Sequence, residues 1–253
     1  MCARRWLFLG VAVALGFASS IGRAQGPAAA FHGIGQLPGG PALSFVADAT
    51  SVSGTIYAVG MASKVGIIDT PFLWDSVNGF TELPPGAATA TTPFLGASSI
   101  TPDARYIAST AHNTVAHPSF TSAVRVTRTG LSLVNTFLDQ LGGLNNGAGT
   151  AVAISDLGLI LYGTTLTHAF GNPSLPGPVF DDGYNRTIRF DLNAPSAALI
   201  PALPGMTQSA PAARGVSREG SIVVGTSWNA PYDRFFFGST NGRAFRYDNA
   251  TGV

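Results

Sequence analysis

The segment Ala213-Arg-Gly-Val-Ser-Arg-Glu-Gly-Ser-Ile-Val-Val-Gly225 decides the fold, because the chain repeats it as Ala151-Val-Ala-Ile-Ser-Asp-Leu-Gly-Leu-Ile-Leu-Tyr-Gly163. Both segments contain small residues, an aliphatic residue, Ser, two turn residues, Gly, an apolar run and a final Gly. Weaker copies span 97–109 and 49–60, and the second of these has one turn residue fewer. Each copy predicts a hairpin of two strands joined by a tight turn.

Two further strands are predicted after each hairpin. The third strand is Phe72-Leu-Trp-Asp75 in the first copy, and its counterparts span 124–127, 188–191 and 245–248. Apolar and polar residues alternate in the last three copies, as expected of half-buried strands. A turn and an outer strand follow at 79–84, 130–135 and 197–204. The repeat is therefore a unit of four short antiparallel strands with connections of variable length.

Four antiparallel strands recurring roughly every 50 residues are typical of a β-propeller blade. A single sheet that is apolar on both faces cannot fold alone, whereas stacking sheet against sheet buries both faces. We therefore expect an all-β β-propeller of about four four-stranded blades, with a β-sandwich or an open β-solenoid as the alternatives. The predicted repeat units are approximately 39–84, 85–135, 136–204 and 205–253, within a repeat domain over residues 25–253.

The two ends of the repeat region leave two interpretations of the ring open. The chain ends at Phe245-Arg-Tyr-Asp-Asn-Ala-Thr-Gly-Val253, in a turn before an expected outer strand. The segment Phe31-His-Gly-Ile-Gly-Gln-Leu-Pro38 resembles that outer strand. The ring is therefore either closed by this N-terminal strand or incomplete, as a fragment of a longer ring. We favour the fragment, since four blades lie at the low end of the known range.

The N-terminus has the pattern of a cleavable signal peptide. Arg4 and Arg5 precede an apolar run over residues 6–17, and Gly22-Arg23-Ala24 places small side chains where a signal peptidase cuts. The run is short of the roughly 20 residues that a membrane span needs. We expect residues 1–24 to be removed, by the general or the twin-arginine route, which leaves no transmembrane span. The mature chain would be secreted, periplasmic or at the cell surface.

Composition narrows the class further. Hydrophobic residues make up 45% of the chain and charged residues only 11%, and Lys64 is the only lysine. Such a sequence disfavours helices with charged surfaces and favours short strands and turns. Loss of the leader leaves 11 basic and 13 acidic residues, so no nucleic-acid binding is expected. Loss of Cys2 leaves no thiol or disulfide chemistry.

The short segments that flank the hairpins resemble those of the HAF repeats in exported bacterial proteins. In that family a Leu-Pro-Gly-Gly segment precedes the hairpin, and a strand like His-Ala-Phe-Arg-Trp follows it. Leu37-Pro-Gly-Gly40 and Leu203-Pro-Gly205 are similar to the first segment, and Arg243-Ala-Phe-Arg-Tyr247 is similar to the second. The His of the family strand is absent, and the literal His168-Ala-Phe170 lies in a predicted loop. The resemblance implies an exported, propeller-like repeat protein and brings no catalytic residue.

The variable connections between the second and third strands of each unit are the candidate binding site. They span 112–121, 166–185 and 228–241, and in a propeller they lie at one face. They are rich in aromatic and basic residues, so we predict a binding rim for a protein or glycan ligand. The rim residues chosen are Trp228, Tyr232, Arg234, Phe236, His168 and Tyr184. The alternative is that these aromatics pack among themselves or cover the channel.

No catalytic, cofactor or metal motif is found in the sequence. His112 and His117 could share a metal, and Asp181-Asp-Gly183 with Asn185 could bind Ca²⁺, but a solvated loop and a turn are the preferred interpretations. Ser155-Asp-Leu-Gly158 only superficially resembles a sialidase Asp-box and is interpreted as a hairpin turn. The first strands of the hairpins supply mainly Ala, Ser, Thr and Gly, with Arg214 as the one charge. We therefore expect a non-enzymatic binding or scaffolding protein without cofactors, and a polysaccharide hydrolase or lyase as the alternative.

Overall fold

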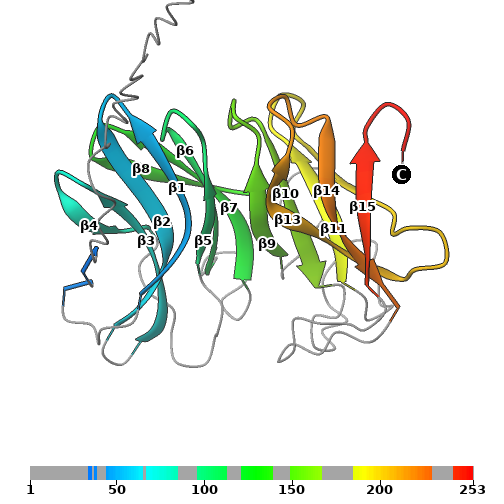
Figure 1. Cartoon of the computed structure of the whole chain (residues 1–253), viewed down its shortest axis with the longest axis horizontal. Helices are drawn as coiled ribbons and strands as arrows, with labels where there is room; N and C mark the ends of the chain where they lie inside the picture. Colours follow the sequence, from blue (N-terminus) through cyan, green and yellow to red (C-terminus); the bar gives the residue numbers. More distant parts are fainter. Residues whose placement is uncertain are drawn as a thin grey trace, which may run out of the picture. The chain divides into compact units, whose positions relative to one another are not determined.

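The computed structural model confirms an all-β propeller of four antiparallel sheets (Figure 1). It describes residues 34–35, 37–38, 44–64, 67–84, 96–112, 121–138, 149–166, 185–229 and 242–252. The predicted signal peptide, residues 1–24, lies outside these ranges. Residues Met1–Gly33 and Ile34–Val253 form two separate units, and the propeller belongs to the second.

The strands follow the predicted repeat. The first sheet contains β1 (Ser44–Val52), β2 (Thr55–Lys64), β3 (Ile67–Asp75) and β4 (Gly79–Glu82). The second contains β5 (Ala97–Ile100), β6 (Tyr106–His112), β7 (Thr121–Thr129) and β8 (Ser132–Phe137). The third contains β9 (Gly149–Ile154), β10 (Ile160–Leu166), β11 (Asn185–Asp191) and β12 (Ser196–Leu199). The last contains β13 (Gln208–Val216), β14 (Ile222–Trp228) and β15 (Arg243–Asp248). β8 runs past the predicted unit boundary at residue 135.

The last sheet differs from the other three in its strand number. Within the described residues it has three strands, because none pairs with the outer edge of β15. The chain turns back after β15 through a bridge between Asp248 and Gly252. The described part of the segment that resembles the outer strand, at Ile34 and Leu37, packs instead against Ala62 and Phe72 of the first sheet. Closure of the last sheet by this segment is therefore not seen in the described residues.

Consecutive sheets bury the faces that they turn toward each other, as the repeat predicts. We call the face of a sheet that lies toward the next sheet in the chain its following face, and the opposite face its preceding face. Val59 and Leu73 on the following face of the first sheet share a core with Ile107 and Val126 on the preceding face of the second. Equivalent cores join the second sheet to the third and the third to the last. Burial on both faces explains why Phe72-Leu-Trp does not alternate like its counterparts.

Each innermost strand carries an irregularity in its pairing at the same place. The register shifts between Val46 and Asp48 in β1, and corresponding shifts occur in β5, β9 and β13. The last residue of each hairpin motif lies at this point, and it is Gly60, Gly163 or Gly225 in three copies and Ser109 in the second. A Cβ on Gly60 would lie 1.9 Å from the carbonyl oxygen of Phe45, and one on Gly225 would lie 2.1 Å from that of Ala210. The repeated glycine therefore allows two backbones to approach closely at a β-bulge.

The hairpin turns explain the Ser or Thr and the Gly of the repeat. The hydroxyl of Ser155 accepts a hydrogen bond from the amide of Ile160 at 3.1 Å. Thr101 and Ser217 make the same contact five residues ahead, at 3.0 Å each. The turn then needs a positive φ, which is 69° at Gly158, 77° at Gly220 and 55° at Ala104. The first hairpin uses a tighter turn at Ser53-Gly54, in agreement with its shorter sequence.

Gly130 and Gly158 can be compared to separate two reasons why a turn needs glycine, the positive φ and the lack of space for a Cβ. Gly130 and Gly158 have similar positive φ values, 62° and 69°. A Cβ on Gly130 would meet nothing within 4 Å, whereas one on Gly158 would lie 2.1 Å from the ring of Tyr106. We predict that Gly130→Ala lowers the free energy of unfolding by about 1 kcal/mol through backbone strain. Gly158→Ala should cost about 1–3 kcal/mol more through overpacking. Equal losses in denaturant titrations would contradict this account.

Candidate functional site

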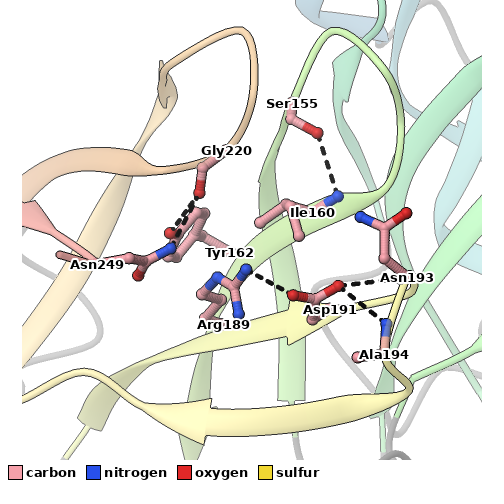
Figure 2. Close-up of polar contacts among 9 residues, drawn as sticks. All are labelled: Ser155, Ile160, Tyr162, Arg189, Asp191, Asn193, Ala194, Gly220 and Asn249. Atoms are coloured by element: carbon pink, nitrogen blue, oxygen red, sulfur yellow. Dashed lines mark hydrogen bonds and ion pairs between the residues drawn. The ribbon is translucent and has the colours of Figure 1, made fainter.

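Several polar side chains of the described sheets lie at the junctions between sheets, near the hairpin turns. Figure 2 shows the junction of the third and last sheets. The hydroxyl of Tyr162 on β10 donates a hydrogen bond to the carbonyl oxygen of Gly220, in the turn between β13 and β14, at 2.8 Å. The side-chain amide of Asn249 donates to the same oxygen at 3.5 Å. A buried phenol of one sheet thus holds the hairpin turn of the next.

Arg189 and Asp191 extend this junction on β11 (Figure 2). The guanidinium of Arg189 pairs with the Asp191 carboxylate at 2.7 Å, and both side chains are mostly buried. Burial raises the pKa of the Tyr162 phenol, even though the nearby positive charge of Arg189 acts in the opposite direction. The phenol therefore stays protonated near neutral pH and remains a hydrogen-bond donor to Gly220.

At the junction of the second and third sheets, an arginine donates the hydrogen bond to the equivalent turn carbonyl. Arg125 on β7 donates to the carbonyl oxygen of Gly158 at 3.0 Å. Its guanidinium also lies over the ring of Tyr106, 4.9 Å from the centroid. Burial lowers the pKa of Arg125, yet an arginine remains charged at any physiological pH. The two junctions therefore present different side chains to equivalent turn carbonyls.

The junction of the first and second sheets contains an arginine, an aromatic ring and a hydroxyl group that contact the same hairpin turn or each other. Arg128 on β7 donates to the carbonyl oxygen of Ala104 at 2.8 Å and stacks on Tyr57, with 4.6 Å between the guanidinium carbon and the ring centroid. The hydroxyl of Thr50 donates to the carbonyl oxygen of Pro102 in the same turn at 3.1 Å. Arginines therefore contact the neighbouring sheet at two junctions, Arg125 through Gly158 and Arg128 through Tyr57. At the third junction the contact is made by the Tyr162 hydroxyl.

The innermost strands carry a carboxylate that sequence inspection missed. Asp48 lies on β1 and is buried, and its carboxylate accepts hydrogen bonds from the Ser99 hydroxyl at 3.2 Å and the Ile100 amide at 3.0 Å. The expectation that Arg214 is the one charge on these strands was therefore wrong. The sequence repeat begins at Ala49, after the bulge, so Asp48 lies outside it. Its hydrogen bonds join the first two sheets.

Three aspartates end the third strands and stabilise the turns that follow. Asp75 accepts hydrogen bonds from the backbone amides of Val77 and Asn78 at 2.9 and 2.6 Å. Asp191 accepts those of Asn193 and Ala194, as Figure 2 shows. Asp248 accepts that of Ala250 at 2.9 Å. The repeated aspartate is therefore a turn-forming residue.

The predicted rim lies largely outside the described residues. Tyr232, Arg234, Phe236, His168 and Tyr184 all fall in the undescribed connections, as do His117 and Asp181-Asp-Gly183. Trp228 ends β14 and is buried, with 8% of its surface exposed. This burial is what the alternative interpretation expects, in which these aromatic residues pack among themselves or cover the channel. The other five rim residues remain predictions.

The antiparallel order of each sheet does fix where these connections leave. β6, β10 and β14 each run away from a hairpin turn and end at His112, Leu166 and Trp228. The connections to the third strands therefore start at the ends of the sheets opposite the turns (Figure 1). Among the described residues, no cluster of three or more His, Cys, Asp or Glu is arranged to hold a metal ion.

Comparison with known proteins supports the fold. No family model matches the chain, and no curated protein matches it. Among solved structures it is similar to TolB from Acinetobacter baumannii, with a TM-score of 0.50 and 14% identity over 85% of this chain and 42% of TolB. An acylaminoacyl peptidase from Pyrococcus horikoshii matches with a TM-score of 0.39 and 11% identity, over 73% of this chain and 28% of the peptidase. A puromycin-hydrolysing peptidase from Mycobacterium tuberculosis gives 0.36 and 16%, over 88% and 38%.

The similarity to TolB concerns the fold alone. The chain spans less than half the length of each of these structures. The described residues contain no helix long and apolar enough to cross a membrane. The resemblance to HAF repeats stays a prediction from sequence.

The Tyr162 hydrogen bond can be removed without removing the ring. We predict that Tyr162→Phe lowers the free energy of unfolding by about 1 kcal/mol, because the carbonyl of Gly220 loses a buried donor. Tyr57→Phe is the control, since a phenylalanine ring retains the cation–π contact with Arg128. It should change stability by less than half as much. A larger loss in Tyr57→Phe would contradict the role given to the phenol.

The lowered pKa of Asp75 predicts that the protein loses stability in acid, when this carboxylate is protonated. Burial alone would raise the pKa of its carboxyl, but hydrogen bonds from Asn78 and Val77, with the charge of Arg128, hold it below the ordinary value of 3.8. A lowered folded pKa means that the carboxylate stabilises the fold above about pH 4 and that this contribution is lost as the pH falls through the folded pKa. Asp75→Ala should cost about 1 kcal/mol at pH 7. The difference from wild type should shrink below pH 4.

Asp75→Asn separates the charge from the turn, because its amide oxygen can still accept the bonds from Val77 and Asn78. Its stability should lie between wild type and Asp75→Ala at pH 7 and change less with acid. Thermal unfolding followed by circular dichroism from pH 3 to 7 would measure this. Parallel pH profiles for all three proteins would show that the ionisation of Asp75 contributes nothing to stability.

Proposed function

We propose that the chain is an exported, non-enzymatic protein that binds or scaffolds at the cell surface or in the periplasm. The observation that carries the proposal is how the described charged groups are used. Asp48, Arg125, Arg128 and Arg189 bond across or beside sheet junctions, and Asp75 and Asp191 bond to turns. These groups therefore support the scaffold, which leaves recognition to the connections at the other end of the sheets.

The composition of those connections supports a binding role. Tyr232, Arg234 and Phe236 fall in one of them, and His168 and Tyr184 in another. Tyrosine and arginine are enriched among residues that dominate binding energy, and aromatic rings supply large contact areas at low entropic cost. Insertions at one end of a repeat fold are a usual place for a binding surface. The ligand class is a protein or a glycan.

The leader supports export. The basic residues, the apolar run and the small residues up to Ala24 match the order of a secretory signal. Expression of the full chain in a bacterial host should therefore give a periplasmic protein that begins at Gln25, as intact mass would show. An unprocessed chain in the cytoplasm would contradict export.

Binding can be tested with a glycan array and the purified, processed protein. We expect Tyr232→Ala combined with Phe236→Ala to weaken the strongest signals at least tenfold. The control is Leu131→Ala, because Leu131 is exposed in the turn between β7 and β8, at the opposite end of the sheets. Equal binding by all variants would refute the rim for glycans. Release of reducing ends from the bound polysaccharide would favour the hydrolase or lyase alternative.

A further inference from the structure

The third strands of the last three sheets repeat an arginine at one position. It is Arg125 on β7, Arg189 on β11 and Arg246 on β15. Two residues later the third and last sheets have Asp191 and Asp248, whose carboxylates form ion pairs with these arginines at 2.7 and 3.3 Å. The second sheet has Thr127 at that position. Arg125 therefore lacks the carboxylate that the repeat supplies to its two counterparts.

No carboxylate from another described element takes the place of the missing one. Within the described part of the chain, Arg125 and the nearby Arg105 form no ion pair. Asp103 is the acidic residue closest to them in the sequence. It accepts hydrogen bonds from the Thr101 hydroxyl at 2.6 Å and from the backbone amide of Arg105 at 3.0 Å. Its carboxylate therefore belongs to the hairpin turn.

Two guanidinium groups instead gather around one aromatic ring. The guanidinium carbons of Arg105 and Arg125 lie 5.1 and 4.9 Å from the centroid of the Tyr106 ring. The ring attracts each cation, but the two cations repel each other. Burial lowers the pKa of Arg125, and the positive charge of Arg105 lowers it further. A negative charge beside both groups would remove this repulsion.

Arg125 keeps donors that the junction between the sheets does not use. Its Nη1 donates to the carbonyl oxygen of Gly158 at 3.0 Å. In Arg189 the other terminal nitrogen, Nη2, donates to Asp191 at 2.7 Å, whereas the Nη2 of Arg125 has no partner among the described residues. Arg105 is exposed and Arg125 is only partly buried, so a ligand from solvent can reach both. Guanidinium groups bind carboxylates strongly because the hydrogen bonds are charge-assisted.

From this comparison within the repeat, we propose that Arg125 and Arg105 bind the carboxylate of an acidic sugar, a uronate unit of a glycan. The carboxylate takes the place beside Arg125 that Asp191 takes beside Arg189. The neighbouring turn favours a sugar over an acidic peptide, because the amide of Gly158 is bonded to Ser155 and its carbonyl to Arg125. An extended peptide would find no backbone partner at this residue. A uronate needs only the guanidinium groups.

This site is separate from the predicted rim. Arg125 contacts the hairpin turn of the third sheet, whereas the connections that carry the rim residues leave the sheets at the opposite ends. The rim variant Tyr232→Ala with Phe236→Ala should therefore bind a uronate at this site as the wild type does. Loss of uronate binding in that variant would overturn the assignment to Arg125 and Arg105.

The first experiment is a calorimetric titration of the purified full chain with a galacturonate trisaccharide at low salt. We expect binding at least about tenfold tighter than that of the neutral galactose trisaccharide, and weaker as salt is added. Arg105→Gln leaves the bond from Arg125 to Gly158 in place and should weaken binding about tenfold. A wild-type protein that binds neither sugar, or both equally, overturns the proposal. Equally tight binding of a triglutamate peptide overturns the assignment to a sugar.

The second experiment supplies the missing carboxylate from the chain itself. Thr127→Asp should weaken galacturonate binding by at least about tenfold, because the new carboxylate occupies Arg125 as Asp191 occupies Arg189. Its thermal unfolding midpoint should exceed that of Thr127→Asn, the uncharged control of the same size. If Thr127→Asp fails to fold by circular dichroism, Arg105→Gln decides.

Two controls separate this effect from changes of shape and of net charge. Thr127→Asn should bind within about twofold of the wild type, since no charge is added at Arg125. Leu131→Asp adds the same charge in an exposed turn of the same sheet and should also keep binding. Equal affinities of Thr127→Asp and Thr127→Asn would overturn the proposal, as would an equal loss of binding in Leu131→Asp.

Discussion

The insertion of a hairpin turn into the side of the preceding sheet is the contact on which the rest of the structure depends. Tyr106 lies on Gly158 and Ile160 lies on Gly220, so closely that no Cβ would fit at either glycine. The turn carbonyls then accept hydrogen bonds from Arg125 and Tyr162. The glycine serves both the backbone conformation and the packing. Because a turn that shifted would lose these contacts together, the spacing from Ser155 to Gly163 has little freedom.

The repeat allowed the sheets to be predicted because local pattern and global fold agree. The hairpins, the third strands and the shorter first turn were predicted from small residues, turn residues and alternation. The bulges were not, since they arise where one strand passes close to another and Gly60 gives no sign of its partner Phe45. The contacts of Asp48 and Arg125 were not predicted either. They join residues from different repeats, and a comparison that aligns repeats shows what the copies share, not which residues face each other.

The two ends of the sheets have different roles. The hairpin turns and the turns after Asp75 and Asp191 use their polar groups to join and cap strands. The connections at the other ends vary in length, from the short link after β2 to the long one after β10. Composition alone does not show whether an aromatic residue is exposed. Trp228, at the end of β14, is buried. Sequence predicts the candidate rim in these connections, but it could not say which of the side chains point outward.

The three-stranded last sheet has a consequence for dynamics. Among the described residues, β15 has a neighbouring strand on one edge and a neighbouring sheet on one face, whereas β7 and β11 lie between two strands and two sheets. Stability in stacked repeats is close to a sum of local and nearest-neighbour contributions. Opening should therefore begin at the C-terminal sheet and spread inward. Amide hydrogens of β15 would exchange well before those of β6 or β10, so a single chain would unfold from its end in steps and not all at once.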